Sequence, residues 1–523
     1  MILKKEISKT ITTSYLIIWS SFFLVSFYNF KFFKEALIAY PITDNYLFVI
    51  SMFFLLWAFL VALLSIICFR WNSKFIISFL LLVASVVSYF MNNYATIIDA
   101  NMVANSSETN LAESLDLFSF KLLLYFIFLG LIPTYLIWKV KLRKTTILKQ
   151  FISNFLLLVG SLSVILLISF MFFKQYTHLS KNNNLVLYAN PMQPIYGLGE
   201  YIYNKFNQST EPFKTIGQDV KIIKKNNLRK LVIVVVGETG RADRFSLNGY
   251  QRLTNPLLKK ERVISWTNMW SCGTDTAWSV PCMFSYLGRE DYNHTEGKNM
   301  SNVLDILKLA GVSVLWKDNN SNSKGVANRV GYQDVRCSPE CRDIHLLDNL
   351  QQFINKQTGD IVIVLHAFGS HGPAYYKRYD KQFEVFKPTC QTNELNKCSD
   401  KEINNVYDNT IVATDYFLSK VINLLKKNTN NFSTAMFYIS DHGESLGENG
   451  LYLHGMPYFL APDVQKRVAS IMWFDKKMTI QHFAKINARR NNKISHDYIF
   501  HTLLGLFDAK TKIYNKNLDL ISY

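Results

Sequence analysis

Long apolar runs in the first third of this chain constrain its fold more than any other feature. Five of them approach or exceed the roughly 20 residues that an α-helix needs to cross a bilayer. They span residues 13–30, 46–69, 75–91, 118–138 and 151–173. We therefore expect a membrane domain of five helices over residues 1–173. The alternative for the first run is a signal peptide, but the further runs favour an uncleaved anchor.

The charges of the loops predict how these spans are oriented. The loop after the second span contains Arg70 and Lys74, and the segment 139–149 contains five Lys or Arg residues. The loop 92–117 has four acidic residues and no Lys or Arg. Because cytoplasmic loops carry the excess of Lys and Arg, we expect a cytoplasmic N-terminus. Five crossings of a bacterial inner membrane then place the C-terminal part in the periplasm.

The cysteines support a periplasmic C-terminal part. Six of the seven cysteines lie there in three close pairs: Cys272 with Cys282, Cys337 with Cys341, and Cys390 with Cys398. Paired cysteines at short spacing are typical of an oxidising compartment. A cysteine-rich metal site is the alternative, but the sequence has no CxxC pair and the three pairs lie far apart. We predict three local disulfides.

The formal net charge of +18 indicates an anionic partner. Anionic lipid head groups fit the apolar spans better than nucleic acid does, because no finger, RNP-type or basic-zipper pattern is present. We expect membrane lipids as partners, no nucleic-acid partner, and a monomer.

Short β-branched runs from residue 231 onward predict an α/β domain with a parallel sheet. The predicted strands are 231–236, 312–316, 361–365, 434–439 and 468–474. Runs this apolar are typical of strands that are buried on both faces. Between them, 402–427 has apolar residues at helical spacing. We therefore predict a connector along the membrane surface over 174–229 and a catalytic α/β domain over 230–523.

Polar side chains of the kind that bind metals follow the predicted strands. Glu238 follows the first strand, the polar run 317–320 follows the second, His371 follows the third, and Asp441 and His442 follow the fourth. Open parallel sheets bind ligands outside the carboxyl ends of their strands, so these side chains should meet at one edge. Any one of them alone is better explained as a helix cap or a satisfied polar residue. Together they predict a metal site, and Glu, Asp and His are suitable ligands for zinc.

The segment 271–282 supplies a candidate nucleophile. It contains Thr274 and Thr276 between Cys272 and Cys282. A Thr hydroxyl is a weak nucleophile near neutral pH, but a bound divalent cation can stabilise its alkoxide. A helix that begins here would add the positive end of its dipole, and a bridge between the cysteines would hold the hydroxyl in place. The alternative is a plain turn rich in Thr and Ser.

Four motifs stand out in the C-terminal part. They are Val-Gly-Glu-Thr-Gly-Arg-Ala-Asp at 236–243, the segment 271–282, His-Ala-Phe-Gly-Ser-His-Gly-Pro at 366–373, and Ser-Asp-His-Gly-Glu-Ser-Leu-Gly-Glu-Asn-Gly at 440–450, followed by His454 and Gly455. Together they resemble the phosphoethanolamine transferases that modify lipid A, a family that includes the mobile colistin-resistance enzymes. The resemblance covers essentially the whole chain. It implies an alkaline-phosphatase-like α/β/α sandwich behind the five-helix membrane domain.

The resemblance also implies a zinc site and a nucleophile. By position in the motifs, Glu238, Asp441 and His442 bind the principal zinc. Thr276 is both a ligand and the nucleophile, because the family places its nucleophile at the second Thr of Gly-Thr-x-Thr. Thr274 is the competing hydroxyl, two residues earlier.

Four more residues have a role implied by the resemblance. His371 and His454 would bind the phosphoryl group or a second, more weakly held zinc. Asn320 and Lys324 resemble the phosphate-binding pair of the family, with Lys324 as a point charge for developing phosphoryl negativity. The alternative for Lys324 is a solvated loop lysine.

Two other regions are compared with the family. Asn105, Thr109 and Glu113 are spaced i, i+4, i+8, so a helix would align them on one face. A similar triad in relatives is thought to contact the donor lipid, and Glu113 would pair with an ethanolamine ammonium; the alternative is the polar face of a surface helix. Cys337 and Cys341 depart from the family, because only three residues separate them where relatives have a longer loop.

The implied reaction is the transfer of phosphoethanolamine from phosphatidylethanolamine to lipid A, lipooligosaccharide or another envelope acceptor, through an intermediate on Thr276. The nearest alternatives are a phosphoglycerol transferase or a sulfatase-like hydrolase of the same fold. A sulfatase would need a Cys or Ser for conversion to formylglycine, and the Cys-x-Pro-x-Arg motif is absent. A transporter or membrane scaffold with an inert external domain is the alternative from another class, and it predicts no bound metal.

Overall fold

The contacts of the chain separate it into two units in the computed structural model. One unit comprises Met1–Ala100 and Phe118–Glu200, and the other comprises Asn101–Leu117 and Tyr201–Tyr523. The structure describes residues 10–108, 111–182, 185–208, 212–223, 228–336 and 342–522. The predicted domain boundaries at residues 174 and 230 stay predictions.

The first unit consists of apolar helices. Four helical stretches are long and apolar enough to cross a membrane: α3 (Ile42–Ile67), α4 (Ser73–Tyr94), Phe120–Lys139, which comprises α7 (Phe120–Tyr125), η1 (Phe126–Leu131) and α8 (Ile132–Lys139), and α9 (Ile147–Met171). A fifth span is formed if α1 (Thr13–Tyr28) and α2 (Phe30–Ala39), which are bent by 63°, are counted as one. At the bend, the Asn29 amide donates to the carbonyl oxygens of Leu24 and Asn190, at 3.1 and 2.8 Å. The five predicted runs coincide with these helices.

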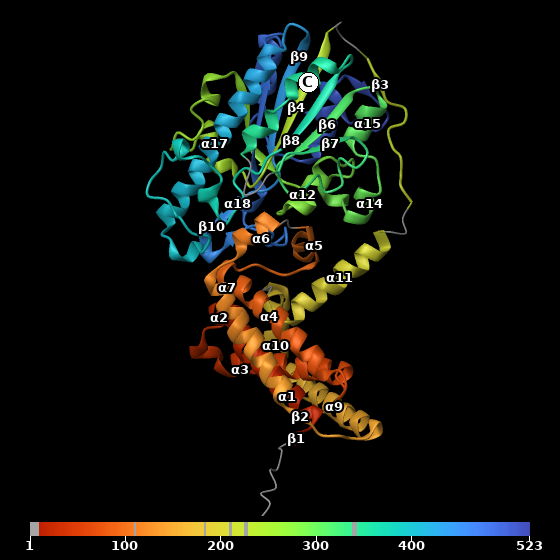
Figure 1. The fold of residues 1–523 in the computed structure, drawn as a ribbon, viewed down its shortest axis with the longest axis vertical. Coiled ribbons are helices and arrows are strands. Elements are labelled where there is room, and N and C mark those ends of the chain that lie inside the picture. The colour runs from red at the N-terminus through yellow and green to blue at the C-terminus, as the bar shows by residue number, and fades with distance from the viewer. Residues whose placement is uncertain are drawn as a thin grey trace, which may run out of the picture. The chain divides into compact units, whose positions relative to one another are not determined.

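An eight-stranded sheet forms the centre of the second unit (Figure 1). Its order is β13-β5-β12-β9-β4-β8-β6-β7. The strands are β4 (Arg229–Gly237), β5 (Val263–Trp270), β6 (Ser313–Asp318), β7 (Gly331–Asp334), β8 (Ile361–His366), β9 (Phe432–Ser440), β12 (Arg467–Phe474) and β13 (Ile494–Ser495). All five predicted strands are present in this sheet.

The sheet is mixed, whereas the sequence predicted a parallel one. Strands β4, β6, β8 and β9 are mutually parallel, but β12 is antiparallel to both of its neighbours, β5 and β9. The reason is that the loop after β9 returns along the same edge, so that β12 enters the sheet where β9 leaves it. Strand β5 therefore runs in the direction of β9, and β13 is parallel to β5. The carboxyl ends of β4, β5, β6, β8, β9 and β13 meet at one edge, here called the catalytic edge.

Helices cover both faces of the sheet and complete an α/β/α sandwich (Figure 1). Successive side chains of a strand point to opposite faces, so a central strand needs apolar partners on both. In β4, Leu231, Ile233 and Val235 pack in the core that includes α17 (Asp400–Lys427). Val232, Val234 and Val236 pack in the other core, with α15 (Val303–Leu309) and α20 (Asp497–Leu506). The predicted helix 402–427 is confirmed, and a capping box between Ser399 and Glu402 begins it.

The segment 101–117 lies between the third and fourth spans in the chain, yet it belongs to the second unit. Asp116 in α6 (Leu111–Leu117) is ion-paired with Arg378, and its other carboxylate oxygen lies 2.6 Å from Lys377 Nζ. The side chains of Asp116 and Arg378 are only 7% and 1% exposed. Burial opposes the charge of Asp116, but Arg378 and Lys377 hold its pKa below the usual range. The Asn393 amide also donates to the Asp116 carbonyl oxygen at 2.8 Å.

We predict that Asp116→Asn releases this segment. The variant leaves the buried Arg378 charge without its carboxylate, a change that typically costs about 3–5 kcal/mol. Because the folded pKa of Asp116 is lowered, its contribution is complete at neutral pH and is lost only as the pH falls below about 3.9. At neutral pH, hydrogen exchange of the 114–117 amides should be faster in the variant, by the factor that corresponds to this loss of free energy.

The control for this prediction is Asp380→Asn. Asp380 pairs with Arg342 at 2.8 Å, but its side chain is 51% exposed. Exposed pairs contribute about 0–1 kcal/mol, so the exchange of 114–117 should not change. Equal protection in the wild type and in Asp116→Asn would contradict the proposed anchoring.

Candidate active site and metal centre

Four side chains converge at the catalytic edge. Glu238 follows β4, Asp441 and His442 follow β9, and Thr276 is the first residue of α12 (Thr276–Met283). The Thr276 hydroxyl lies 3.1 Å from Glu238 Oε2 and 3.3 Å from His442 Nε2. His442 Nε2 lies 3.3 Å from both Glu238 Oε1 and Asp441 Oδ2. The structure thus brings together the four residues that the sequence predicted as ligands.

The spacing of these atoms fits a small divalent cation. Glu238, Asp441 and His442 form a group of candidate metal ligands whose ligand atoms all lie within 4.8 Å of one another. Among the described residues, no side chain or backbone group donates a hydrogen bond to the buried Glu238 Oε1 or Asp441 Oδ2. A tetrahedral site with bonds of about 2.0 Å has edges of about 3.3 Å between ligands. The observed separations are close to such edges.

The charges of the cluster favour a cation as well. Burial opposes a charge on the His442 ring, yet Asp441 and Glu238 raise its pKa to about 10. Burial and the nearby Glu238 raise the pKa of Asp441 to about 7. A proton on His442 therefore offsets part of the negative charge. A divalent cation would provide the same compensation and displace that proton.

The nucleophile segment is held at both ends. Asp275 caps α12 by accepting a hydrogen bond from the Trp278 amide at 2.9 Å, so Thr276 lies in the first turn, at the positive end of the helix dipole. The predicted disulfide between Cys272 and Cys282 is present and brackets this turn. The competing hydroxyl, Thr274, donates to the Met456 carbonyl oxygen at 2.6 Å. It is therefore engaged outside the cluster.

The remaining disulfide predictions have different outcomes. The predicted bond between Cys390 and Cys398 is present. Cys337 and Cys341 lie outside the described residues, so their pairing stays a prediction.

Two histidines lie beside the four-residue cluster. The His454 ring is 4.3 Å from the His442 ring and 5.6 Å from the His371 ring, between centroids. His454 Nδ1 lies 2.8 Å from the buried Glu444 carboxylate, which orients the ring. His371 and His454 form a further group of candidate metal ligands with Glu238. Both roles predicted for these histidines, binding a phosphoryl group or a second cation, are compatible with this placement.

Asn320 and Lys324 also lie near the cluster. The Asn320 amide donates to Glu238 Oε2 at 2.7 Å and to the Ala367 carbonyl oxygen at 2.9 Å, so it holds a candidate ligand in place. Lys324 is only 3% exposed, which contradicts the alternative of a solvated loop lysine. It lines a cavity of about 670 Å³ together with Lys298. Phosphate binding by Asn320 and Lys324 stays a prediction.

The predicted donor-lipid triad is only partly described. Asn105 lies on α5 (Ala100–Glu108), while Thr109 and the side chain of Glu113 lie outside the described residues. The same helix approaches the catalytic edge: a Cβ atom on Gly455 would lie 2.6 Å from Met102 Cε. Gly455 has a φ of 84° and directly follows His454. The triad stays a prediction, but its helix contacts the turn that carries His454.

One buried residue at this edge, His496, is not among those that the sequence predicted. His496 follows β13 and accepts a hydrogen bond at Nδ1 from the Cys272 amide, at 3.0 Å. Its Nε2 lies 3.0 Å from the Ser440 carbonyl oxygen. Burial lowers the pKa of His496 to about 3. It belongs to no motif, and the two-residue strand before it is too short to predict.

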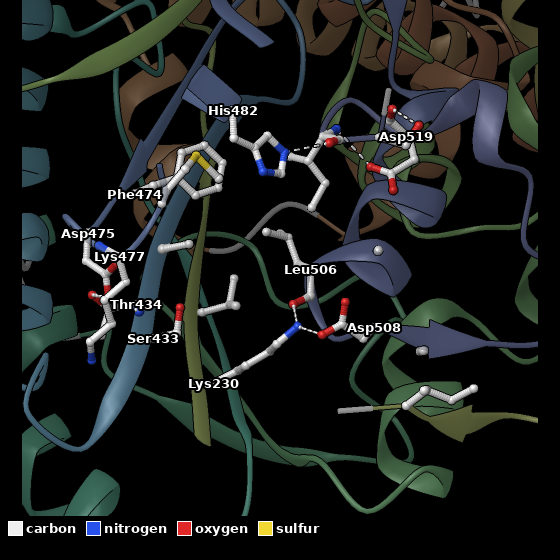
Figure 2. A pocket seen from close by; sticks show the side chains of 18 of the residues that line it. Lys230, Ser433, Thr434, Phe474, Asp475, Lys477, His482, Leu506, Asp508 and Asp519 are labelled. Carbon is white, nitrogen blue, oxygen red and sulfur yellow. Dashed lines mark hydrogen bonds and ion pairs between the residues drawn. The ribbon is translucent and has the colours of Figure 1, made fainter. Parts of the chain in front are cut away.

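The opposite edge of the sheet has a cavity of a different kind. Figure 2 shows this cavity, which has a volume of about 650 Å³ and lies at the start of β4 and β9 and the end of β12. Lys230 points to the Leu506 carbonyl oxygen, at 2.6 Å, and to the Asp508 carboxylate (Figure 2). His482 lies 3.1 Å from the Ile521 carbonyl oxygen. The basic side chains that Figure 2 labels in this cavity lie within hydrogen-bond distance of carbonyl or carboxylate oxygens of the protein. The groups of candidate metal ligands among the described residues lie at the catalytic edge instead.

Known proteins resemble both parts of the chain. Residues 56–206 match the family model described as phosphoethanolamine transferase EptA/EptB, and residues 230–509 match the sulfatase family model. Phosphoethanolamine transferase EptA of Escherichia coli (strain K12) is 38% identical over 521 residues, covering 96% of this chain and 95% of that protein. Phosphatidylethanolamine transferase Mcr-1 of Escherichia coli is 40% identical over 93% of each. The solved integral membrane lipooligosaccharide phosphoethanolamine transferase A from Neisseria meningitidis aligns with a TM-score of 0.94 and 34% identity, over 98% of this chain and 99% of that one.

We predict that the two disulfides of the described residues differ in their effect on the site. They close loops of similar size, with sequence separations of 10 and 8. Replacing either pair by Ser should lower the free energy of unfolding by about 2.5 kcal/mol in the loop-entropy model. Only the Cys272/Cys282 variant should weaken binding of a zinc probe, by about tenfold or more, because it loosens the turn that holds Thr276.

Chelator competition measures the affinity, and denaturant unfolding measures the stability. The Cys390/Cys398 variant serves as the matched control. Equal zinc affinities for both variants would show that the first disulfide contributes to stability alone.

Proposed function

The chain belongs to the phosphoethanolamine transferases of the EptA/EptB type, and on this basis we propose that it transfers phosphoethanolamine from phosphatidylethanolamine to an acceptor of the bacterial envelope. The observation that carries the proposal is the Thr276 hydroxyl in the first turn of α12, 3.1 Å from Glu238 and 3.3 Å from His442. The chain is an enzyme of the inner membrane, with several spans and a periplasmic catalytic domain.

Zinc is the cation that we assign to the metal centre. Glu238, Thr276, Asp441 and His442 would hold it, which supplies the four N and O ligands that zinc accepts in tetrahedral geometry. When bound, zinc acts as a Lewis acid and stabilises the alkoxide of the nucleophile. The two buried carboxylate oxygens that accept no hydrogen bond support this assignment.

In the first half of the reaction, Thr276 Oγ1 attacks the phosphorus of phosphatidylethanolamine. A bond forms between Oγ1 and phosphorus, the bond from phosphorus to the glycerol oxygen breaks, and diacylglycerol leaves with a proton on that oxygen. His371 and His454 would bind the phosphoryl oxygens. Glu444 supports this role because it orients the His454 ring. The product is a phosphoethanolamine ester of Thr276.

In the second half, a phosphate or hydroxyl oxygen of the acceptor attacks the same phosphorus and releases Thr276. Lipid A or lipooligosaccharide is the acceptor class that we propose. Lys298 and Lys324, two basic residues that line one cavity of about 670 Å³, support a phosphate-bearing acceptor. Burial raises the pKa of Asp275, the cap of the nucleophile helix, and Lys324 is among the charged groups that oppose this rise.

The donor lipid would contact α5 and the segment that follows it. Asn105, Thr109 and Glu113 are the residues that we assign to the ethanolamine head group. The contact of Met102 with Gly455, next to His454, supports this assignment because it brings α5 to the catalytic edge.

We predict that Thr276 carries the covalent intermediate. Thr276→Ala should be folded and inactive, and Thr276→Ser should keep part of the activity because the hydroxyl does the chemistry. With a fluorescent phosphatidylethanolamine and no acceptor, the wild type should release about one equivalent of labelled diacylglycerol. Intact-mass analysis should then find one phosphoethanolamine adduct on the peptide that contains Thr276.

The matched control is Thr274→Ala, two residues away. Its hydroxyl is bonded to the Met456 carbonyl, so we expect the adduct to form in this variant. An adduct that maps to Thr274 would overturn the choice of nucleophile.

We also predict that variants of the metal ligands differ in zinc content from variants of the two histidines beside them. Asp441→Ala and His442→Ala should lose bound zinc and activity together. His371→Ala and His454→Ala should keep the principal zinc and lose turnover. Zinc affinity should fall as the pH is lowered, because the cation must displace the proton that Asp441 and Glu238 retain on His442.

Elemental analysis of the purified full chain gives the stoichiometry for this prediction. Full zinc occupancy in Asp441→Ala and His442→Ala would show that the ligand assignment is wrong.

A further inference from the structure

A buried imidazole connects the nucleophile segment to the turn that carries two candidate ligands. His496 is 1% exposed and lies at the catalytic edge, between Cys272 on one side and Ser440 on the other. Cys272 begins the turn that leads to Thr276, and Ser440 directly precedes Asp441. We propose that His496 is a positioning residue that sets the separation between Thr276 and the Asp441–His442 pair; this inference rests on the proposed metal centre.

The partners of His496 determine its protonation state. The Cys272 amide is a donor, so Nδ1 must accept and carries no proton. Nε2 faces a carbonyl oxygen, so it carries the proton and donates. The ring is therefore the neutral Nε2–H tautomer. In this form one rigid ring spans two backbone groups that belong to different loops.

A second side chain, Ser279, connects the same two segments beside the imidazole. Ser279 Oγ, in α12, donates to the Asp441 carbonyl oxygen and lies 3.4 Å from His496 Nδ1. It also accepts from the Gly273 amide at 3.3 Å. The nucleophile segment thus bonds to the Ser440–Asp441 turn through two side chains. The connection through His496 ends on the carbonyl oxygen of Ser440, next to Asp441, and the connection through Ser279 ends on the carbonyl oxygen of Asp441 itself.

The edge strand β13 explains how His496 reaches this place. Ile494 and Ser495 pair with Met269 and Trp270 of β5, and the His496 amide donates to the Trp270 carbonyl oxygen at 2.9 Å. Strand β5 leads directly into the nucleophile segment. Because β13 extends the sheet beside it, the first residue after β13 lies next to the first residues after β5. The two-residue strand therefore places one side chain under the nucleophile turn.

The position of His496 predicts an effect on the metal centre that ordinary core packing would not have. The hydrogen bonds of His496 go to the backbone amide of Cys272 and the backbone carbonyl of Ser440, so it acts on the ligands through these two groups. Its loss would let Thr276 move relative to Asp441 and His442. Residues that orient metal ligands from outside typically contribute about 10–100-fold to metal affinity or activity.

Helix α20, which begins directly after His496, offers a matched control. His501 lies five residues further on in α20, is 3% exposed, and accepts a hydrogen bond at Nδ1 from the Asn515 amide at 3.1 Å. Burial lowers its pKa to about 4, so it is neutral like His496. His496→Ala and His501→Ala therefore each remove one buried neutral imidazole and one acceptor for a backbone amide. Only the first touches the nucleophile segment.

The experiment uses the full chain in detergent, with zinc affinity measured by chelator competition and turnover with fluorescent phosphatidylethanolamine. His496→Ala should weaken zinc binding by about tenfold or more and lower kcat with little change in KM. His501→Ala should lower Tm as much as His496→Ala does and leave zinc affinity and kcat unchanged. His496→Gln, whose amide can keep one of the two bonds, should retain more zinc affinity than His496→Ala.

The outcomes separate the inference from the proposed function. Equal zinc affinity in the two Ala variants overturns the role of His496 and leaves the transferase assignment intact. A wild-type protein that holds no zinc at Glu238, Asp441 and His442 overturns the metal centre itself. Should His496→Ala fail to fold, Ser279→Ala tests the connection through the Ser279 hydroxyl, and wild-type zinc affinity in that variant would count against the inference.

Discussion

Two buried carboxylates that share one imidazole determine much of the arrangement around them. Glu238 Oε1 and Asp441 Oδ2 each lie 3.3 Å from His442 Nε2, and all three side chains are fully buried. Charges of the same sign in such a place repel each other, and the pKa of Asp441 reflects this as well as burial. The cluster therefore requires positive charge. The Asn320 amide holds Glu238 in place without supplying that charge, because it is neutral.

The mixed sheet is what brings these groups to one edge. Strand β12 begins where β9 ends, so the loop between them, which contains His454, stays at the catalytic edge. Strand β5, on the other side of β12, then delivers Thr276 to the same place. A fully parallel sheet would need a crossover connection between β9 and β12. The antiparallel strand lets the His454 loop stay at the edge without one, whereas residues 238–262 connect β4 to β5, which run in the same direction.

The parts of the fold that the sequence predicts are those with a strong local signal. The apolar spans and the strand 231–236 are continuous apolar runs, and the helix 402–427 has apolar residues at helical spacing; tertiary contacts override none of these signals. Strand β5 was missed because polar residues such as Ser265, Thr267 and Asn268 interrupt its apolar run, and its pairing with β12 decides its conformation. His496 depends on long-range contacts as well, since its partners lie 224 and 56 residues away. The burial of Lys324 and the bond between Asn320 and Glu238 likewise exist only in the folded sheet.

The anchoring of residues 101–117 makes the catalytic unit discontinuous along the chain. Asp116 and Arg378 are 262 residues apart, and two apolar spans separate them in the sequence. During synthesis, the first piece of this unit is exported with the third and fourth spans, long before the sheet exists. The unit closes only after the last strands have crossed the membrane. Its maturation therefore depends on the insertion of the membrane helices, and a fragment that starts after them would bury the Arg378 guanidinium without its carboxylate.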